Sequence, residues 1–357
     1  MSAASDTVAV AVGDLRRLVE AVLAAAGVPP RHAALVADGL LDADLEDQSS
    51  HGVLLLPLYV ERILGGSVAP AADGRIVRDT PTSIVIDAEN ALGQVTSEKA
   101  VALCITRSRA HGMAAVAVRN GFHFGTAGRW ARRIAEAGQL GMAMSNTRPL
   151  MPAPGGAERV VGNNPVAIAV PAAGGHPIVA DVALSAGAMM KIRFAEATGA
   201  AIPNGWATDA DGRPTTDAAL AIKGMLLPAG GAKGFALAAL IDLIAGGLSA
   251  GAIGDEVRPL YGDPKLPYRC AHFFLAIDIA RFTPIELFAA AAEVFAAKVR
   301  GSRPSPNAGA LRMPGDRAVA ARAARRERCP LQRSMLDALT ALAARLNVAV
   351  PAGLENS

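Results

Sequence analysis

Cysteine, aromatic residues and long apolar runs are all scarce in this 357-residue chain. Its three cysteines are scattered and give neither a disulfide framework nor a metal-ligand spacing. Such usage is typical of a reducing cytosol. No segment reaches the roughly 20 apolar residues of a membrane span, and the N-terminus has no basic stretch followed by an apolar one. We therefore expect a soluble, cytoplasmic protein with no metal and no membrane partner.

A strong excess of charge is also missing, because the formal net charge is only +3. That value does not indicate a nucleic-acid partner. The arginines between 322 and 328 form the one basic cluster, but no aromatic residues interleave with them, so a solvated helix face is the favoured interpretation. Hydrophobic residues make up 52% of the chain, enough for a large core.

Two common phosphate-binding motifs are absent as well. No G-x-G-x-x-G follows the first predicted strand, so a Rossmann fold has no motif behind it. Lys233 and Gly234 follow two glycines at a predicted helix start, but the spacing is not that of a P-loop. A lysine flanked by glycines can still pair with a phosphate or a carboxylate there.

What is present is an alternation of helical and strand-like segments. Apolar periodicity and turn residues predict helices at 10–26, 30–47, 94–112, 126–138, 186–198, 235–246, 283–299, 317–328 and 331–346, with another beginning near 54. Strands are predicted at 82–87, 113–119, 140–146, 165–171, 177–185 and 270–279, and a loop at 200–218. The β-α-β order favours a parallel sheet in an α/β protein.

Two histidines stand in positions suited to chemistry. His51 follows Ser50 at a predicted helix start, where a neutral imidazole could take a proton from a hydroxyl near neutral pH. His123 lies between two phenylalanines, in a glycine-bearing turn that leads into a helix. The free backbone N–H groups of such a turn attract anions. An ordinary cap or turn with an incidental histidine is the alternative for each. Asp181 and Ser185 lie at a strand end, where ligands or a simple helix cap are both expected.

Six segments, in sequence order, resemble motifs of the type 2 malate/L-lactate dehydrogenase family. They are S-H-G at 50–52, G-F-H-F-G at 121–125, G-G-A-E-R-V-V-G-N-N-P at 155–165, D-V-A-L-S at 181–185, P-x-G-G-x-K-G at 228–234 and F-F-L-A-I-D at 273–278. The resemblance extends from about residue 10 to about residue 330. Ureidoglycolate and sulfolactate dehydrogenases and cyclic ketimine reductases belong to this family.

The resemblance implies a fold that is not a Rossmann fold. We expect a cofactor domain around a large mixed or mostly antiparallel sheet, with a helical lobe built from both chain ends. The predicted division is 1–75 and 283–357 for the helical lobe and 76–282 for the cofactor domain. A homodimer or higher homo-oligomer is implied. The family's sheet conflicts with the parallel one favoured above, and we follow the family because periodicity does not reveal strand direction.

The resemblance also assigns roles to residues. His51 matches a catalytic acid/base oriented by Ser50, and His123 matches a second histidine for proton transfer or the cofactor pocket. Tyr59 would face the substrate. The residues that match the binding segments for NAD or NADP are His123, Phe124, Gly125, Thr126, Ala127, Asp181, Val182, Ala183, Leu184, Ser185, Lys233 and Gly234.

Several positions depart from the family pattern around the substrate. Leu55 stands where many members carry an arginine that clamps the substrate carboxylate with two hydrogen bonds. Asn163, Leu184 and Met190 replace a threonine, a threonine and a glycine. We expect Leu55, Asn163 and Lys191 to contact the substrate. Leu54, Leu55 and Met190 predict a more apolar pocket for a bulkier 2-oxo acid.

The predicted reaction is hydride transfer between a nicotinamide and C2 of a 2-hydroxy acid, with the protein positioning C2 and moving the proton. A cyclic ketimine is the alternative substrate. A cofactor-binding relative without catalytic activity is the alternative from another class.

Overall fold

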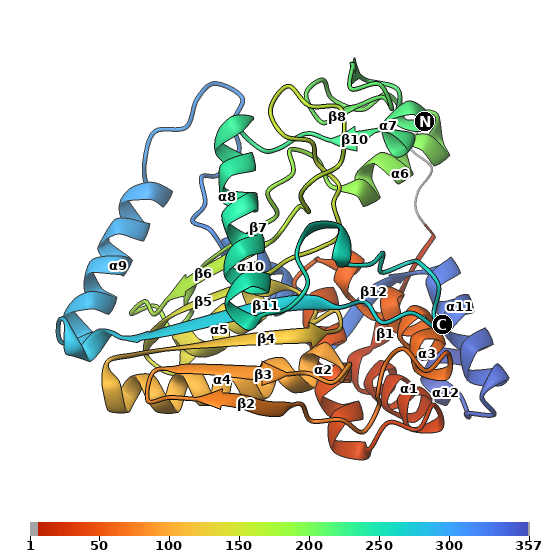
Figure 1. The fold of residues 1–357 in the computed structure, drawn as a ribbon, viewed down its shortest axis with the longest axis horizontal. Coiled ribbons are helices and arrows are strands. Elements are labelled where there is room, and N and C mark those ends of the chain that lie inside the picture. The colour runs from red at the N-terminus through yellow and green to blue at the C-terminus, as the bar shows by residue number, and fades with distance from the viewer. Residues whose placement is uncertain (1–5, 356–357) are drawn as a thin grey trace.

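A seven-stranded sheet of order β2-β3-β4-β11-β5-β6-β7 forms the centre of the computed structural model, which describes residues 6–355 (Figure 1). Its strands are β2 (Arg75–Asp79), β3 (Ser83–Asp87), β4 (Met113–Gly121), β5 (Gln139–Ser145), β6 (Val166–Val170), β7 (Ile178–Val182) and β11 (Cys270–Asp278). Strands β3 and β4 pair in parallel, and the other neighbours in this sheet pair antiparallel. The mixed, mostly antiparallel sheet is confirmed. The parallel sheet favoured by the β-α-β order is wrong.

Alternating side chains of the central strands pack on opposite faces of this sheet. In β5, Ala143 joins a core with α4 (Gly93–His111) and α5 (Ala127–Glu136), to which Trp130 and Ile134 contribute. The next residue, Met144, joins a second core that includes Ile241 of α8 (Ala232–Asp242). A strand reverses its side chains at every residue, so both faces of the sheet are covered.

The two chain ends meet in a helical lobe. Strand β1 (Thr7–Ala11) pairs antiparallel with β12 (Arg328–Gln332). A third core contains buried residues from α1 (Val12–Ala25), α2 (Pro30–Leu45), α3 (Leu56–Leu64), α11 (Arg333–Arg345) and α12 (Ala352–Glu355). The lobe implied by the resemblance is thus present, while the exact division at residues 75 and 282 stays a prediction.

The predicted helix at 317–328 is wrong in its last four residues. Helix α10 (Asp316–Ala324) ends earlier, and the chain then extends into β12, where Cys329 and Leu331 turn into the helical core. The predicted loop at 200–218 contains β8 (Ala207–Thr208) and β9 (Pro214–Thr215), which form a small sheet with β10 (Met225–Leu226). This sheet packs beside α6 (Met189–Thr198) and α7 (Ala218–Lys223).

Helix α9 (Ile285–Arg300) lies at the edge of the molecule, away from the helical lobe (Figure 1). Its Leu287, Val294 and Phe295 are each more than half exposed, as are Leu237 and Leu240 of α8. Among the described residues, no helix combines the length and apolar character that crossing a membrane requires.

Candidate active site

A cavity of about 260 Å³ lies where the helical lobe meets one edge of the large sheet. Because β5 runs antiparallel to β6 and β11, its last residues lie beside the first residues of those two strands. The loops at this edge supply most of the lining, and the turn after α2 closes it from the helical lobe. The lining residues are Gln48, His51, His123, Phe124, Gly125, Thr126, Ala127, Ser145, Thr147, Asn163, Pro165, Asp181, Ala183, Tyr268 and Cys270.

His51 reaches the cavity from a short 3₁₀ turn, Ser49–His51, between α2 and α3. Ser50 Oγ lies 2.9 Å from His51 Nδ1 and fixes the orientation of the ring. Burial lowers the pKa of His51 below its usual value, because a charged ring would lose hydration there. The ring is therefore neutral near pH 7.

His123 reaches the same cavity from the loop between β4 and α5. Tyr59 Oη lies 2.7 Å from His123 Nδ1, and Gln94 Nε2 donates a hydrogen bond of 3.0 Å to that Oη. Tyr59 Oη has one hydrogen, which can be donated to Nδ1 or to the backbone oxygen of His123 at 3.2 Å. Donation to Nδ1 leaves the proton of the neutral ring on Nε2. Burial holds the pKa of His123 well below its usual value, and the nearby imidazoles of His51 and His272 lower it further by charge repulsion.

The two imidazole rings are stacked, with centroids 5.5 Å apart and an interplanar angle of 27°. Each Nδ1 is engaged by a protein hydroxyl, so each Nε2 is the nitrogen that remains for a ligand. One neutral ring can accept a proton from a hydroxyl while the other donates a hydrogen bond to the same oxygen. This arrangement is suited to moving a proton at a carbon-bound oxygen.

The His123 loop is held in place from two sides. Trp130 Nε1 donates a hydrogen bond of 3.0 Å to the backbone oxygen of Phe124. On the other side, Gly93 begins α4 so close to the loop that a Cβ atom would collide with the backbone oxygens of Phe122 and His123. The position of His123 therefore depends on a close backbone approach that glycine permits.

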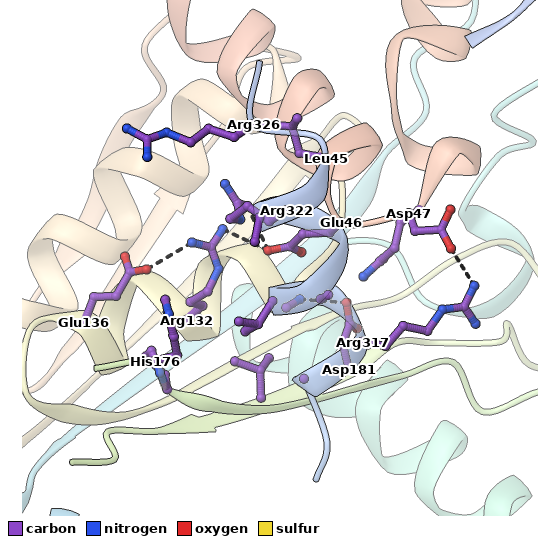
Figure 2. A pocket seen from close by; sticks show the side chains of 18 of the residues that line it. Leu45, Glu46, Asp47, Arg132, Glu136, His176, Asp181, Arg317, Arg322 and Arg326 are labelled. Atoms are coloured by element: carbon purple, nitrogen blue, oxygen red, sulfur yellow. Dashed lines mark hydrogen bonds and ion pairs between the residues drawn. The ribbon is translucent and has the colours of Figure 1, made fainter. Parts of the chain in front are cut away.

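A larger cavity of about 910 Å³ adjoins the first and shares Gln48 and Asp181 with it. Its walls come from the end of α2, from α5, from β7 with the loop before it, and from α10, which crosses it (Figure 2). Asp181 lies between the cavities and accepts a hydrogen bond of 3.0 Å from Gly128 N at the start of α5. Burial raises the pKa of Asp181 to about 6.

A family model described as malate/L-lactate dehydrogenase matches residues 10–340. The chain belongs to this family. It is 35% identical over 344 residues to a malate dehydrogenase of Pyrococcus abyssi, covering 94% of each chain. It is 34% identical over 335 residues to a (2R)-3-sulfolactate dehydrogenase (NADP(+)) of Chromohalobacter salexigens, covering 94% of this chain and 98% of the relative. A solved sulfolactate dehydrogenase of Methanocaldococcus jannaschii superposes with a TM-score of 0.91 at 31% identity, over 96% of this chain and 98% of that one.

Membership in the malate/L-lactate dehydrogenase family confirms the prediction of an oxidoreductase that acts on 2-hydroxy acids. One relative is named as an NADP(+)-dependent enzyme and another as an NAD(+)-dependent one, in agreement with the predicted NAD or NADP.

Many of the predicted site residues of this family member meet at the smaller cavity. His51, His123, the run from Phe124 to Ala127, Asn163, Asp181 and Ala183 line it. Tyr59 is fully buried behind His123, and Ser50 supports His51. Asn163 Oδ1 accepts a hydrogen bond of 3.0 Å from Thr147 Oγ1. The roles of these residues stay predictions.

Other predicted site residues lie elsewhere. Lys191 lines the larger cavity and not the smaller one. Val182 is exposed, Leu184 is buried in a core, and Ser185 pairs with Pro228. Lys233 and Gly234 begin α8 and line neither cavity.

The three residues of the predicted apolar substrate pocket do not meet at the smaller cavity. Leu55 is only 2% exposed and belongs to the helical core, whereas Leu54 and Met190 are exposed on the surface. None of the three lines the smaller cavity. The match to the family's arginine position predicts that Leu55 faces the substrate, but the turn after Gly52 directs it into the helical core.

The lining residues missed from the sequence are Gln48, Ser145, Thr147, Pro165, Tyr268 and Cys270. Three of them lie at or just beyond the end of a strand, where ligand contacts are expected in α/β proteins, so the sequence offered a signal for Ser145, Thr147 and Cys270. Tyr268 lies on a long loop that Arg62 holds in place. The Arg62 guanidinium donates hydrogen bonds of 2.7–2.8 Å to the backbone oxygens of residues 259, 260, 263 and 266.

Proposed function

We propose that this protein transfers a hydride between NAD(P) and C2 of a small 2-hydroxy or 2-oxo acid held against the His51–His123 pair. The observation that supports this most directly is the pair of stacked, neutral histidines, each with its Nε2 available in a cavity of the dehydrogenase family's fold. When bound, the nicotinamide supplies the hydride acceptor or donor. The chain's own residues then position the acid and move the proton.

His51 is the proposed acid/base. In the oxidation direction its neutral ring accepts the proton of the C2 hydroxyl as the hydride leaves. His123 donates its Nε2–H to the same oxygen, since Tyr59 keeps its Nδ1 occupied. In reduction the protonated form of His51 returns the proton to the oxygen at C2. Both rings are half-buried, where such hydrogen bonds are stronger than in open water.

The two adjoining cavities fit a dinucleotide. The smaller one has room for a nicotinamide and a small acid, and the larger one continues past Asp181 and the start of α5. The backbone N–H groups that begin α5 favour negative charge nearby. We place the nicotinamide beside residues 123–127 and the adenosine end beneath α10.

Arg148 is the proposed anchor for an acidic group of the substrate. It would replace the family's clamp arginine, whose position is occupied by Leu55 in this chain. It follows Thr147 of the cavity wall and lies near Tyr268. It is half-buried, and within residues 6–355 it has no ion pair and no hydrogen bond. Burial lowers the pKa of Arg148, and the positive charge of Arg159 adds to this effect. A half-buried cation without a partner is costly, so an anionic ligand would stabilise it.

Replacement of Arg148 by methionine should reveal this contact. Arg148 does not line the cavity around the histidines, so it would meet an acidic group remote from C2. We expect Arg148→Met to lower kcat/KM for oxaloacetate about 10- to 100-fold, since one or two charge-assisted hydrogen bonds are lost. The value for pyruvate, which lacks the second carboxylate, should change less than about threefold. Arg193→Met, which removes an exposed neighbouring charge, is the control. Equal losses for both substrates would mean that Arg148 has only a structural role.

The reaction itself is tested by following reduced nicotinamide absorbance with NADH and NADPH. The panel contains pyruvate, oxaloacetate, sulfopyruvate, phenylpyruvate and a cyclic ketimine. Turnover of a 2-oxo acid is expected. Turnover of the ketimine alone would favour the imine reductase alternative, and tight cofactor binding without any turnover would favour the non-catalytic one.

We also propose that a second copy of the chain covers the exposed apolar side chains of α8 and α9 in a homodimer. Leucine, valine and phenylalanine exposed on these two helices are the kind of side chains that a subunit interface buries. The cytoplasmic location stays a proposal based on cysteine usage.

A further inference from the structure

The larger cavity contains many charged side chains, but most of them neutralise one another. Arg322 pairs with Asp42 and, at 2.8 Å, with Glu46. Arg132 lies 3.0 Å from Glu136 and 3.4 Å from Glu46, and Arg317 lies 2.5 Å from Asp47 (Figure 2). These pairs tie α10 and α5 to the end of α2, and they leave little net charge for a ligand.

Arg326 lines this cavity without a carboxylate partner among residues 6–355. It lies just past the end of α10, it is exposed, and it lines the cavity. No ion pair or hydrogen bond engages its side chain within the described part of the chain, and Figure 2 shows no contact between it and the paired residues drawn around it. Lys191, the other unpaired cation of the lining, lies over the ring of Trp206 at 5.9 Å.

Three of the four carboxylates that line the larger cavity are paired with arginines. Glu46, Asp47 and Glu136 are each engaged by an arginine. Asp181 lies at the inner end, where the two cavities meet. No carboxylate of the lining is therefore free at the outer end. An NAD site commonly uses such a carboxylate to bind the ribose hydroxyls, whereas an NADP site uses a cation to bind the 2′-phosphate.

We propose that Arg326 binds the 2′-phosphate of NADP and makes this chain selective for NADP(H) over NAD(H). The proposal rests on the proposed function, because it requires the adenosine end of the cofactor in the larger cavity. A free guanidinium matches a phosphate with two parallel hydrogen bonds. NAD offers only a hydroxyl at the same place and would leave that guanidinium unpaired.

The experiment measures dissociation constants rather than turnover. Binding of NADPH and NADH to the full chain is titrated by the fluorescence of the reduced nicotinamide, for the unmodified protein, Arg326→Gln and Arg345→Gln. Arg345 is an exposed arginine of α11 that lines neither cavity, so it controls for the loss of one positive charge. We expect NADPH to bind at least about tenfold more tightly than NADH to the unmodified protein. Arg326→Gln should weaken NADPH about 10- to 30-fold and NADH less than twofold.

Three outcomes would overturn the proposal. They are tighter binding of NADH than of NADPH by the unmodified protein, an equal loss for both cofactors in Arg326→Gln, and no loss at all. An equal loss would place Arg326 at the pyrophosphate, which both cofactors carry. Adenosine 2′,5′-bisphosphate and AMP, used as competitors, provide a second measurement, since only the former should lose affinity in the variant. Failure to bind either cofactor would instead overturn the proposed function.

Discussion

Replacing His51 with alanine should lower kcat for 2-oxo acid reduction at least about 100-fold, because general acid–base catalysis commonly contributes 10²- to 10⁴-fold. Cofactor affinity should change less than about twofold, since the proposed role of His51 is at the substrate oxygen. The turn is held by backbone hydrogen bonds and by the bond from Val53 N to the Asp44 carboxylate, none of which uses the imidazole, so the fold should be retained. Single-turnover kinetics and a cofactor titration measure the two quantities separately.

The pH dependence provides a further test of the same role. Oxidation needs neutral His51, so its rate should rise with pH through the pKa of that residue and then level off. Reduction needs the protonated ring and should fall as pH rises through the same range. Burial lowers this pKa, so both changes should occur below the usual range for histidine. His111→Ala, at the exposed end of α4, is the control. Full activity of His51→Ala would transfer the acid/base role to His123.

The two histidines could be found from the sequence because each lies in a local pattern with its own physical reason. A serine–histidine pair at a helix start and a histidine in a glycine-bearing turn are readable without tertiary structure. Their stacking could not be read, because it depends on the α2–α3 turn meeting the β4–α5 loop across 72 residues of chain. The same limit applies to Tyr59, whose hydrogen bond to His123 joins two elements far apart in sequence.

Strand direction and side-chain direction were the other limits. Six of the seven strands of the large sheet were located, and β2 was missed. Their alternation with helices suggested parallel pairing, but only β3 with β4 pairs that way in the described sheet. Leu55 was expected in the substrate pocket because it matches the position of the family's clamp arginine. The structure turns it into the core, because Gly52 interrupts the helical path between them.

Arg62 shows why some site residues leave no local signal. It lies in the last turn of α3, where an arginine in a sequence is expected to face solvent, yet it is 1% exposed. Its guanidinium organises the loop that brings Tyr268 to the cavity, through backbone oxygens about 200 residues away. Such a partner set cannot be inferred from either segment alone.

Asp44→Asn should raise the free energy of unfolding by about 2–4 kcal/mol at pH 8 and by much less at pH 4. Asp44 is 2% exposed; its Oδ2 accepts a 2.8 Å hydrogen bond from Val53 N, and its Oδ1 has no hydrogen-bond partner among the described side chains and backbone. Burial raises its pKa from 3.8 to about 7. The unfolded chain therefore releases this proton near pH 4 but the folded chain only near pH 7. Stability is lost as pH rises between these values, by about 1.36 kcal/mol per pKa unit or about 4 kcal/mol in all. Asparagine removes that penalty but leaves its own amide to be satisfied.

The gain should not damage the active site, because the asparagine oxygen can still accept from Val53 N and hold the turn that carries His51. The carboxyl of Asp44 packs directly on Gly52, with no room for a side chain there, so the variant must keep the size of the aspartate. Urea unfolding at pH 4, 6 and 8 measures the effect. Asp47→Asn is the matched control and should have the opposite effect on stability. The hydrogen bond from Arg317 lowers the pKa of Asp47, so loss of this carboxylate should reduce the free energy of unfolding at pH 8. A loss of stability in Asp44→Asn that is the same at every pH would show that the carboxylate is satisfied in the folded protein. A gain confined to high pH would show that the folded chain bears the cost of an ionised, buried carboxyl close to His51.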